Sequence, residues 1–301
     1  MTATILSENI LPGLPSASGV EIIGDTAFVI GDDSPYLYRL DAATMAPTGR
    51  VALFETTDFS SGRIPKPAKP DLECMAALTW PDGRAGLLLL GSGSRPNRAR
   101  GWFVPTEAEI PSIVPEALNL TLFYARLQDR LPVGAVLNLE AAATSATELL
   151  LFQRTMGRAD GAVVFVLPLA ATLEFLAGIS AVVPPGEVVW LALPAIGGCP
   201  AGFSGATFVD GHLFVAASVE DTADALLDGA VLGSFVGVVD VAARTSTFAR
   251  LAWADGRAYR GKVEGLAVRQ QLAPGQFELL LVTDDDAGGS TAATAHLVLS
   301  P

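Results

Sequence analysis

Five residues that could bind a metal recur along the chain at a nearly regular spacing. They are 52, 67, 64 and 60 residues apart, and they are Glu21, Glu73, Glu140, Ser204 and Glu264. Carboxylates that converge raise one another's pKa unless a cation compensates their charge. Calcium takes about six to eight oxygen ligands from carboxylates, carbonyls and waters in flexible geometry. The repeated acids and the serine therefore predict a calcium site with these five residues as ligands.

A purely structural role for the same acids is the alternative. Each could accept hydrogen bonds from backbone amides or pair with a nearby base, so that the group fills the centre of the fold without a metal. Zinc, copper and iron fit less well, because His212 and His296 stand in strand-like contexts and lack ligand spacing.

Basic side chains stand close to these acids in the sequence. The segment 92–100 holds three arginines in a Gly- and Ser-rich loop, two more follow the next apolar strand, and a lysine precedes each of two glutamates. Arginine forks bind phosphate or carboxylate in a bidentate manner. Arginines and a cation in one pocket suit an anionic, phosphorylated ligand. We therefore expect substrate binding by Lys69, Arg98, Arg158 and Lys262.

Together these residues predict calcium-dependent hydrolysis of a small phosphorylated molecule. The cation would polarise the substrate and lower the pKa of a water molecule. Arginines would neutralise developing charge and an acid would act as general base, so the candidate catalytic residues are Asp33, Arg95, Arg154, Glu220 and Asp285. The alternative function is a non-catalytic ligand-binding protein whose centre holds a structural metal or an acid–base plug. Fold class alone does not separate the two.

The elements that must position these residues form a repeat. Each key residue is followed by an apolar strand, a polar turn and a second, strongly apolar strand, as in Thr26–Ile30 and Tyr36–Leu40. From Glu264 through the C-terminus and round to Glu21 is 58 residues, so the repeat closes on itself. Short strands with Gly, Pro and Asp turns at this period suit four-stranded propeller blades. We predict an all-β, five-bladed β-propeller that forms one domain over residues 1–301.

The order of strands in a blade explains why the polar residues would converge. Successive strands are antiparallel, so the start of the innermost strand and the end of the next lie on the same face. The polar clusters after the second strands would therefore join the key residues at one mouth of the central channel.

A fourth, outer strand is expected for each unit. The candidates span residues 49–55, 119–128, 188–193 and 247–253. The last unit reaches Pro301 after three strands, and the stretch 3–11 would complete it and close the ring without exposed edges. Helical periodicity is weak throughout. Six blades are the alternative, if residues 106–129 hide a degenerate unit.

Charge and composition exclude two classes of partner. With 19 basic and 32 acidic residues the net charge is −13, which repels nucleic acid and anionic membranes. No apolar run is long enough to span a bilayer, and the N-terminus lacks the basic region of a targeting segment. Cys74 and Cys199 offer no disulfide framework. We expect a cytoplasmic monomer whose partner is a small anionic molecule.

Several short motifs resemble those of known propeller families. They are Ser18–Glu21, Gly31–Ser34, Lys69–Glu73, Gly91–Arg95, Phe203–Ala206 and Lys262–Gly265. In these motifs the chain resembles uncharacterised bacterial propellers that form a domain family of unknown function. It is also similar to SdiA-regulated and phytase-esterase-like propellers.

A more distant similarity is to the calcium-dependent soluble apyrases. It implies a central calcium held by Glu73, Glu140, Ser204 and Glu264, with Ser18 or Glu21 completing the ring. The apyrase nucleotide-binding segments are not recognisable in this sequence, so nucleotide hydrolysis is not implied.

Overall fold

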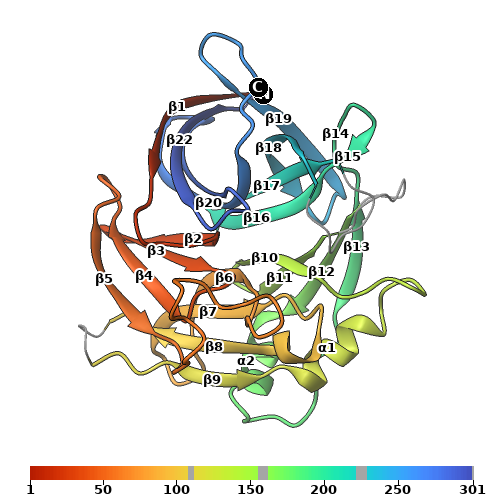
Figure 1. Cartoon of the computed structure of the whole chain (residues 1–301). Helices are drawn as coiled ribbons and strands as arrows, with labels where there is room; N and C mark the ends of the chain where they lie inside the picture. The colour runs from red at the N-terminus through yellow and green to blue at the C-terminus, as the bar shows by residue number, and fades with distance from the viewer. Residues whose placement is uncertain (108–111, 155–161, 222–228, 300–301) are drawn as a thin grey trace.

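The chain folds into antiparallel sheets arranged around a central axis, which is a β-propeller fold (Figure 1). The computed structural model describes residues 1–107, 112–154, 162–221 and 229–299. Strands that are apolar on both faces dominate, because each sheet packs between two neighbours. The expected all-β class is therefore confirmed.

Three of the sheets have four strands each, in sequence order from the centre outward. The first contains β2 (Ala17–Ile23), β3 (Thr26–Gly31), β4 (Tyr36–Asp41) and β5 (Pro47–Ala52). The second contains β6 (Leu72–Thr79), β7 (Ala85–Gly91), β8 (Arg100–Pro105) and β9 (Glu116–Asn119). The third contains β10 (Leu139–Thr144), β11 (Glu148–Gln153), β12 (Ala162–Pro168) and β13 (Glu187–Leu191).

The remaining long strands belong to one eight-stranded sheet, in the order β16-β17-β18-β19-β1-β22-β21-β20. Its first half contains β16 (Gly202–Val209), β17 (His212–Glu220), β18 (Val231–Asp240) and β19 (Thr245–Trp253). Its second half contains β20 (Lys262–Ala273), β21 (Gln276–Asp284), β22 (Ser290–Val298) and β1 (Thr2–Ile10). The N-terminal strand β1 pairs antiparallel with β22 and parallel with β19, so the two ends of the chain are joined as expected.

The first strands of the successive sheets form a closed ring. Strands β2, β6, β10, β16 and β20 each contact the next, and β20 returns to β2. Figure 1 shows these strands around the centre, with the later strands of each sheet farther out. The starts of the inner strands and the ends of the strands paired to them therefore share one face, which is the channel mouth.

One outer strand differs from the expectation. Residues 119–128 do not form a strand, because β9 ends at Asn119 and α1 (Thr121–Gln128) follows. Phe123, Tyr124 and Leu127 are buried on one side of that helix, which matches the helical repeat rather than an alternating strand. A second helix, α2 (Leu169–Leu176), follows β12. No helix in the described part of the chain is long and apolar enough to cross a membrane.

Two short elements complete the described structure. The two-residue strands β14 (Ala195–Ile196) and β15 (Cys199–Pro200) pair in a hairpin before β16. A 3-10 turn, η1 (Pro96–Arg98), lies in the loop between β7 and β8. That loop carries Arg95 and Arg98, two of the three arginines noted in the sequence, and the third, Arg100, begins β8.

Candidate functional site

Every inner strand carries a β-bulge at the same place near the channel mouth. The pairing register skips one residue in each strand, and the skipped residues are Ser18, Glu73, Glu140, Ser204 and Glu264. A bulge sets its residue outside the regular ladder and turns its side chain. The repeated key position is therefore a repeated backbone irregularity.

The structure places Ser18, not Glu21, at this position in the first sheet. Glu21 lies three residues farther along β2, at the level of Thr207, and its carboxylate is hydrogen-bonded to Thr207 and to the backbone of Ala77. Burial is the main cause that raises the pKa of Glu21 to about 8. The sequence register erred because a bulge adds a residue that no alternating pattern reveals. With Ser18, the first spacing becomes 55 rather than 52 residues.

Small residues follow the bulged positions and bring the inner strands close together. They are Gly19, Cys74, Ala141, Gly205 and Gly265. A Cβ atom on Gly265 would lie 2.8 Å from the Cα atom of Gly19, and one on Gly205 would lie 3.0 Å from the Cα atom of Gly265. The space beneath the ring is only about 10 Å³, so the channel is nearly closed below the mouth.

Above the ring lies a polar cavity of about 120 Å³. Among the described residues, its charged lining comprises seven basic residues (Arg63, Lys66, Lys69, Arg95, Arg98, Arg154 and Lys262) and seven acidic residues (Asp32, Asp71, Glu73, Glu140, Glu264, Asp284 and Asp286). Formal charges in this lining therefore balance. Ser16, Ser18 and Asn138 contribute further polar groups.

One ion-pair network occupies the side of the cavity next to β6 and β7. The Nζ atom of Lys69 lies 2.8 Å from Oδ1 of Asp71 and also pairs with Asp32. Nη1 of Arg98 lies 2.5 Å from Oδ2 of Asp71 and 2.7 Å from Oγ of Ser94. The positive charge of Lys69 thus lies between two carboxylates that a metal would otherwise bind.

A second network joins β11, β17 and β20. The Nζ atom of Lys262 lies 2.8 Å from Asp286, 3.2 Å from Glu264 and 3.5 Å from Glu220. Arg154 pairs with Glu220 and lies 3.4 Å from Glu140. Each buried base in this network is shared by several acids, which reduces the electrostatic penalty of burial.

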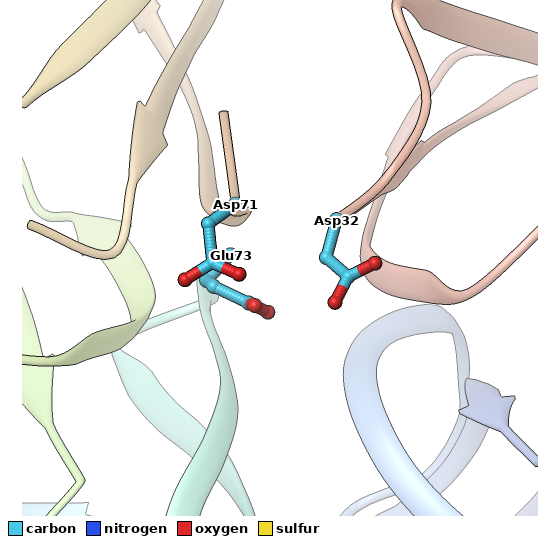
Figure 2. Close-up of side chains that lie close together, drawn as sticks. All are labelled: Asp32, Asp71 and Glu73. Atoms are coloured by element: carbon cyan, nitrogen blue, oxygen red, sulfur yellow. The ribbon is translucent and has the colours of Figure 1, made fainter. Parts of the chain in front are cut away.

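Between the two networks, Glu73 makes no hydrogen bond or ion pair with any described residue. Its carboxylate faces Asp32 and Asp71, and one oxygen from each of the three lies within 4.8 Å of the others (Figure 2). Burial, and then the nearby charges of Glu140, Asp71 and Asp32, raise the pKa of Glu73 well above its ordinary value. A bound cation would supply the compensation that this carboxylate lacks.

Three more carboxyl groups of the lining also have raised pKa values. Burial raises the pKa of Asp32 to about 6, partly offset by Lys69. Burial likewise raises the pKa of Glu140 to about 7, against the opposing effect of Arg154. For Asp284, burial and the nearby charge of Asp32 raise the pKa to about 7. The lining therefore exchanges protons near neutral pH.

The structure separates the expected catalytic residues into two groups. Arg95 and Arg154 line the cavity, whereas Asp33, Glu220 and Asp285 do not. Nε of Arg63 lies 2.5 Å from Asp33, and Asp285 accepts hydrogen bonds from backbone amides of its own turn. Glu220 is fully buried within the second network, paired with Arg154 and Lys262. These three acids hold other groups in place.

Of the expected substrate-binding residues, Lys69, Arg98 and Lys262 line the cavity, and Arg158 falls outside the described residues. Sequence reasoning missed Arg63 and Lys66, which come from the long loop between β5 and β6 and carry no strand pattern. It also missed Asp71 as a site residue. Its carboxylate, directly before β6 and two residues before Glu73, was a signal that could have identified it.

Comparisons with known proteins bear on family and fold. A family of unknown function, DUF6929, matches residues 13–297. No curated protein matches the chain. The glutaminyl cyclase of Myxococcus xanthus is a similar solved structure, with 11% identity, coverage of 99% of this chain and 98% of that chain, and a TM-score of 0.53.

Two further solved structures are less similar. The native arabinanase of Bacillus subtilis has 10% identity, covers 95% of each chain and has a TM-score of 0.49. The Cps50 β-propeller domain from Myceliophteria thermophila has 11% identity, coverage of 93% and 67%, and a TM-score of 0.34. At such identities these likenesses concern the fold, not the chemistry.

Proposed function

Since the chain belongs to DUF6929, a family of unknown function, we propose its function from the channel mouth itself. The protein is a calcium-binding β-propeller that takes a small anionic, phosphorylated ligand into the mouth and hydrolyses it. The observation that carries the proposal is the Glu73 carboxylate, unpaired among the described residues and facing Asp32 and Asp71.

The donor set fits calcium. Oxygens on opposite sides of a calcium ion are roughly 5 Å apart, because each bond is about 2.3–2.6 Å. One oxygen from each of Asp32, Asp71 and Glu73 lies within 4.8 Å of the others, so one ion could contact all three. Glu140 and Glu264 line the same cavity, as does the hydroxyl-bearing Ser18. A calcium ion there would neutralise phosphoryl oxygens and polarise the phosphorus centre.

The balanced lining favours joint entry of calcium and an anion. An anion that entered without calcium would leave an excess of negative charge in a mostly buried cavity, which is unfavourable. A divalent cation with a doubly charged anion keeps the balance of seven basic and seven acidic side chains. A ligand whose negative charge offsets the positive charge of calcium is therefore favoured.

The hydrolysis in this proposal is a displacement at phosphorus. Water forms the new P–O bond, the bond to the leaving oxygen breaks, and one proton passes from the water to a carboxylate. The leaving oxygen takes up a proton, so the products are an alcohol and phosphate. Asp284 is the candidate base, because it lines the cavity and is half-buried.

We also propose that the fold comprises five blades and that its likeness to soluble apyrases and to SdiA-regulated propellers reflects common ancestry. Support for the blade count comes from the eight-stranded sheet, whose described halves share backbone pairing only between the parallel strands β1 and β19. Support for the apyrase likeness comes from the bulged ring of three glutamates and two serines.

A specific observation favours a second candidate, an acid–base plug without metal. Lys69 lies between Asp32 and Asp71, and Lys262 forms ion pairs with three other acids. Much of the negative charge of the cavity is therefore already paired. In that case the mouth would be a structural centre, and calcium would not alter stability.

Thermal unfolding with and without calcium separates the two candidates. We expect calcium to raise the melting temperature of the wild type and to have little effect on Glu73→Gln, which keeps the shape of the side chain but lacks its charge. Glu174→Gln, an exposed position on α2, should keep the full calcium shift. A wild-type melting temperature that calcium leaves unchanged would rule out the calcium site and favour the plug.

A further inference from the structure

The cavity at the mouth is a pocket with one entrance. Beneath the bulged ring the backbones of Gly19, Gly205 and Gly265 are too close to admit a Cβ atom between them, and the cavity there measures only about 10 Å³. A water molecule needs about 10–15 Å³ of such space, so nothing larger than a single water passes below the ring. A ligand must enter and leave through the rim.

The pocket is also too small to enclose a drug-sized molecule. Its volume is about 120 Å³, whereas pockets that enclose a drug-sized ligand measure about 300–1,000 Å³. Only one end of such a molecule fits inside. The rest of the molecule must lie outside, over the loops that surround the mouth.

Charge is distributed along the depth of this pocket. The acids Glu73, Glu140 and Glu264 stand on the inner strands at its base, where Arg154 pairs with Glu140 and Lys262 with Glu264, which leaves Glu73 for a cation. The exposed rim carries Arg95 and Lys66 beside one acid, Asp286, which pairs with Lys262, so the rim favours an anion.

Arg95 is the rim residue best placed to select the anion. Its guanidinium makes no hydrogen bond or ion pair with any described residue, although it lines the pocket. By contrast, Arg63 already donates from Nε to Asp33 and from Nη2 to Ser16. All the donors of the Arg95 fork therefore remain available for a ligand, in the planar geometry that matches phosphate.

Building on the calcium site proposed above, we propose that the ligand is a phosphomonoester that binds end-on, with Arg95 as its specificity-determining residue. A terminal phosphoryl group has a single substituent, which points out through the one entrance. Above pH 7 it carries close to two negative charges, because its second pKa is about 6, and these match the two positive charges of calcium. A phosphodiester has two substituents and one negative charge, and it meets neither requirement.

Three probes separate the effect of ligand shape on binding from that of ligand charge. Their binding is measured by calorimetry at pH 8, with and without calcium. Phenyl phosphate has one substituent and two negative charges. Phenyl sulfate has the same shape but one negative charge, and diphenyl phosphate has two substituents and one negative charge. We expect phenyl phosphate to bind in the presence of calcium, at least tenfold more tightly than either of the others.

Substitution of Arg95 tests whether this residue determines the preference for a phosphomonoester. Arg95→Ala should weaken phenyl phosphate binding about tenfold or more, since a charge-assisted hydrogen bond contributes roughly 1.5–3 kcal/mol and 1.4 kcal/mol is a factor of ten. The calcium-induced rise in melting temperature should be unchanged in this variant. Arg100→Ala is the matched control, because Arg100 is exposed at the start of β8 and does not line the pocket.

The outcomes distinguish this inference from the proposed function. If calcium stabilises the protein but diphenyl phosphate binds as tightly as phenyl phosphate, the end-on phosphomonoester is refuted and the calcium site stands. The same holds if Arg95→Ala binds phenyl phosphate like the wild type. If calcium neither stabilises the protein nor promotes phenyl phosphate binding, both proposals fail.

Discussion

At the scale of single residues, the channel mouth is characterised by charged side chains whose burial costs free energy. Glu73, Glu140 and Glu264 share one small cavity, and two of them have a buried base beside them. Glu73 forms no ion pair with a described residue, and burial together with the nearby charges of Glu140, Asp71 and Asp32 raises its pKa well above the ordinary value, against the opposing effect of Lys69. This imbalance supports the proposed cation site over a fully paired polar core.

Glu21 provides a pH test that is separate from the ring. Its pKa is raised to about 8 in the folded protein, so between about pH 4.5 and pH 8 the folded state holds a proton that the unfolded state has released. Stability therefore falls as the pH rises through this window. The contribution of Glu21 is fully favourable below pH 4.5 and is lost above pH 8.

We expect Glu21→Gln to remove this part of the pH dependence. Urea denaturation at pH 5 and pH 8 should show a smaller loss of stability for the variant than for the wild type, and the variant should be the more stable protein at pH 8. Glu55→Gln, at an exposed position, is the control. If the wild type and Glu21→Gln lost the same stability between pH 5 and pH 8, Glu21 would be ionised in the folded protein.

At the scale of elements, the bulge and the small residue after it act together. The bulge turns Ser18, Glu73, Glu140, Ser204 or Glu264 out of the regular ladder, and the small residue lets the inner strands approach. The strands thereby form the closed floor of the pocket. Loops from two neighbouring sheets then add the basic rim, with Arg63 and Lys66 before β6 and Arg95 before η1.

Alanine substitutions in the floor should destabilise the fold in a graded way. The added Cβ of Gly265→Ala would lie 2.8 Å from a backbone Cα atom, and that of Gly205→Ala 3.0 Å from another, so backbone must shift in both. Overpacking of this kind costs about 1–3 kcal/mol. In chemical denaturation, the free energy of unfolding should be lowest for Gly265→Ala, higher for Gly205→Ala and highest for the wild type. Wild-type stability in both variants would mean that the inner strands are farther apart than described.

At the scale of the whole molecule, closure depends on β1. This strand contributes to the last unit of the eight-stranded sheet by pairing with β22, and it contacts β19 on its other edge. The N-terminal residues thus connect the two halves of that sheet, and Thr2 lies opposite Val298 where β1 runs beside β22 (Figure 1). Loss of this strand would expose two sheet edges and weaken the ring that fixes the mouth.

Two neighbouring residues in β1 test the contribution of closure. Ile5 is 1% exposed in the core between the outer strands, whereas Leu6 is 53% exposed on the surface. Ile5→Ala should reduce the free energy of unfolding by about 2–5 kcal/mol, and Leu6→Ala by well under 1 kcal/mol. Equal effects of the two substitutions in thermal or urea unfolding would contradict the strand placement.

The sequence by itself determined much of this description. Recurrent polar signals before pairs of apolar strands predicted an all-β repeat, and the antiparallel order of strands predicted that Glu21, Glu73, Glu140, Ser204 and Glu264 meet at one mouth. Glu73, Glu140 and Glu264 line one cavity, whereas Glu21 and Ser204 do not. What the sequence predicted correctly rests on strand alternation and repeat spacing, which are local properties that survive in a single chain. The same reasoning found the arginines of the loop at 92–100.

Only the tertiary structure decided the rest. Ser18 replaces Glu21 in the ring because a β-bulge shifts the register, and α1 replaces an expected strand because its apolar residues pack at helical spacing. The partners of Lys69 and Lys262, and the unpaired state of Glu73 among described residues, depend on side chains that are brought together from distant parts of the chain. Such long-range electrostatics has no local signature. The sequence therefore predicted that the carboxylates converge, and the packing decided which of them lacks a counter-charge.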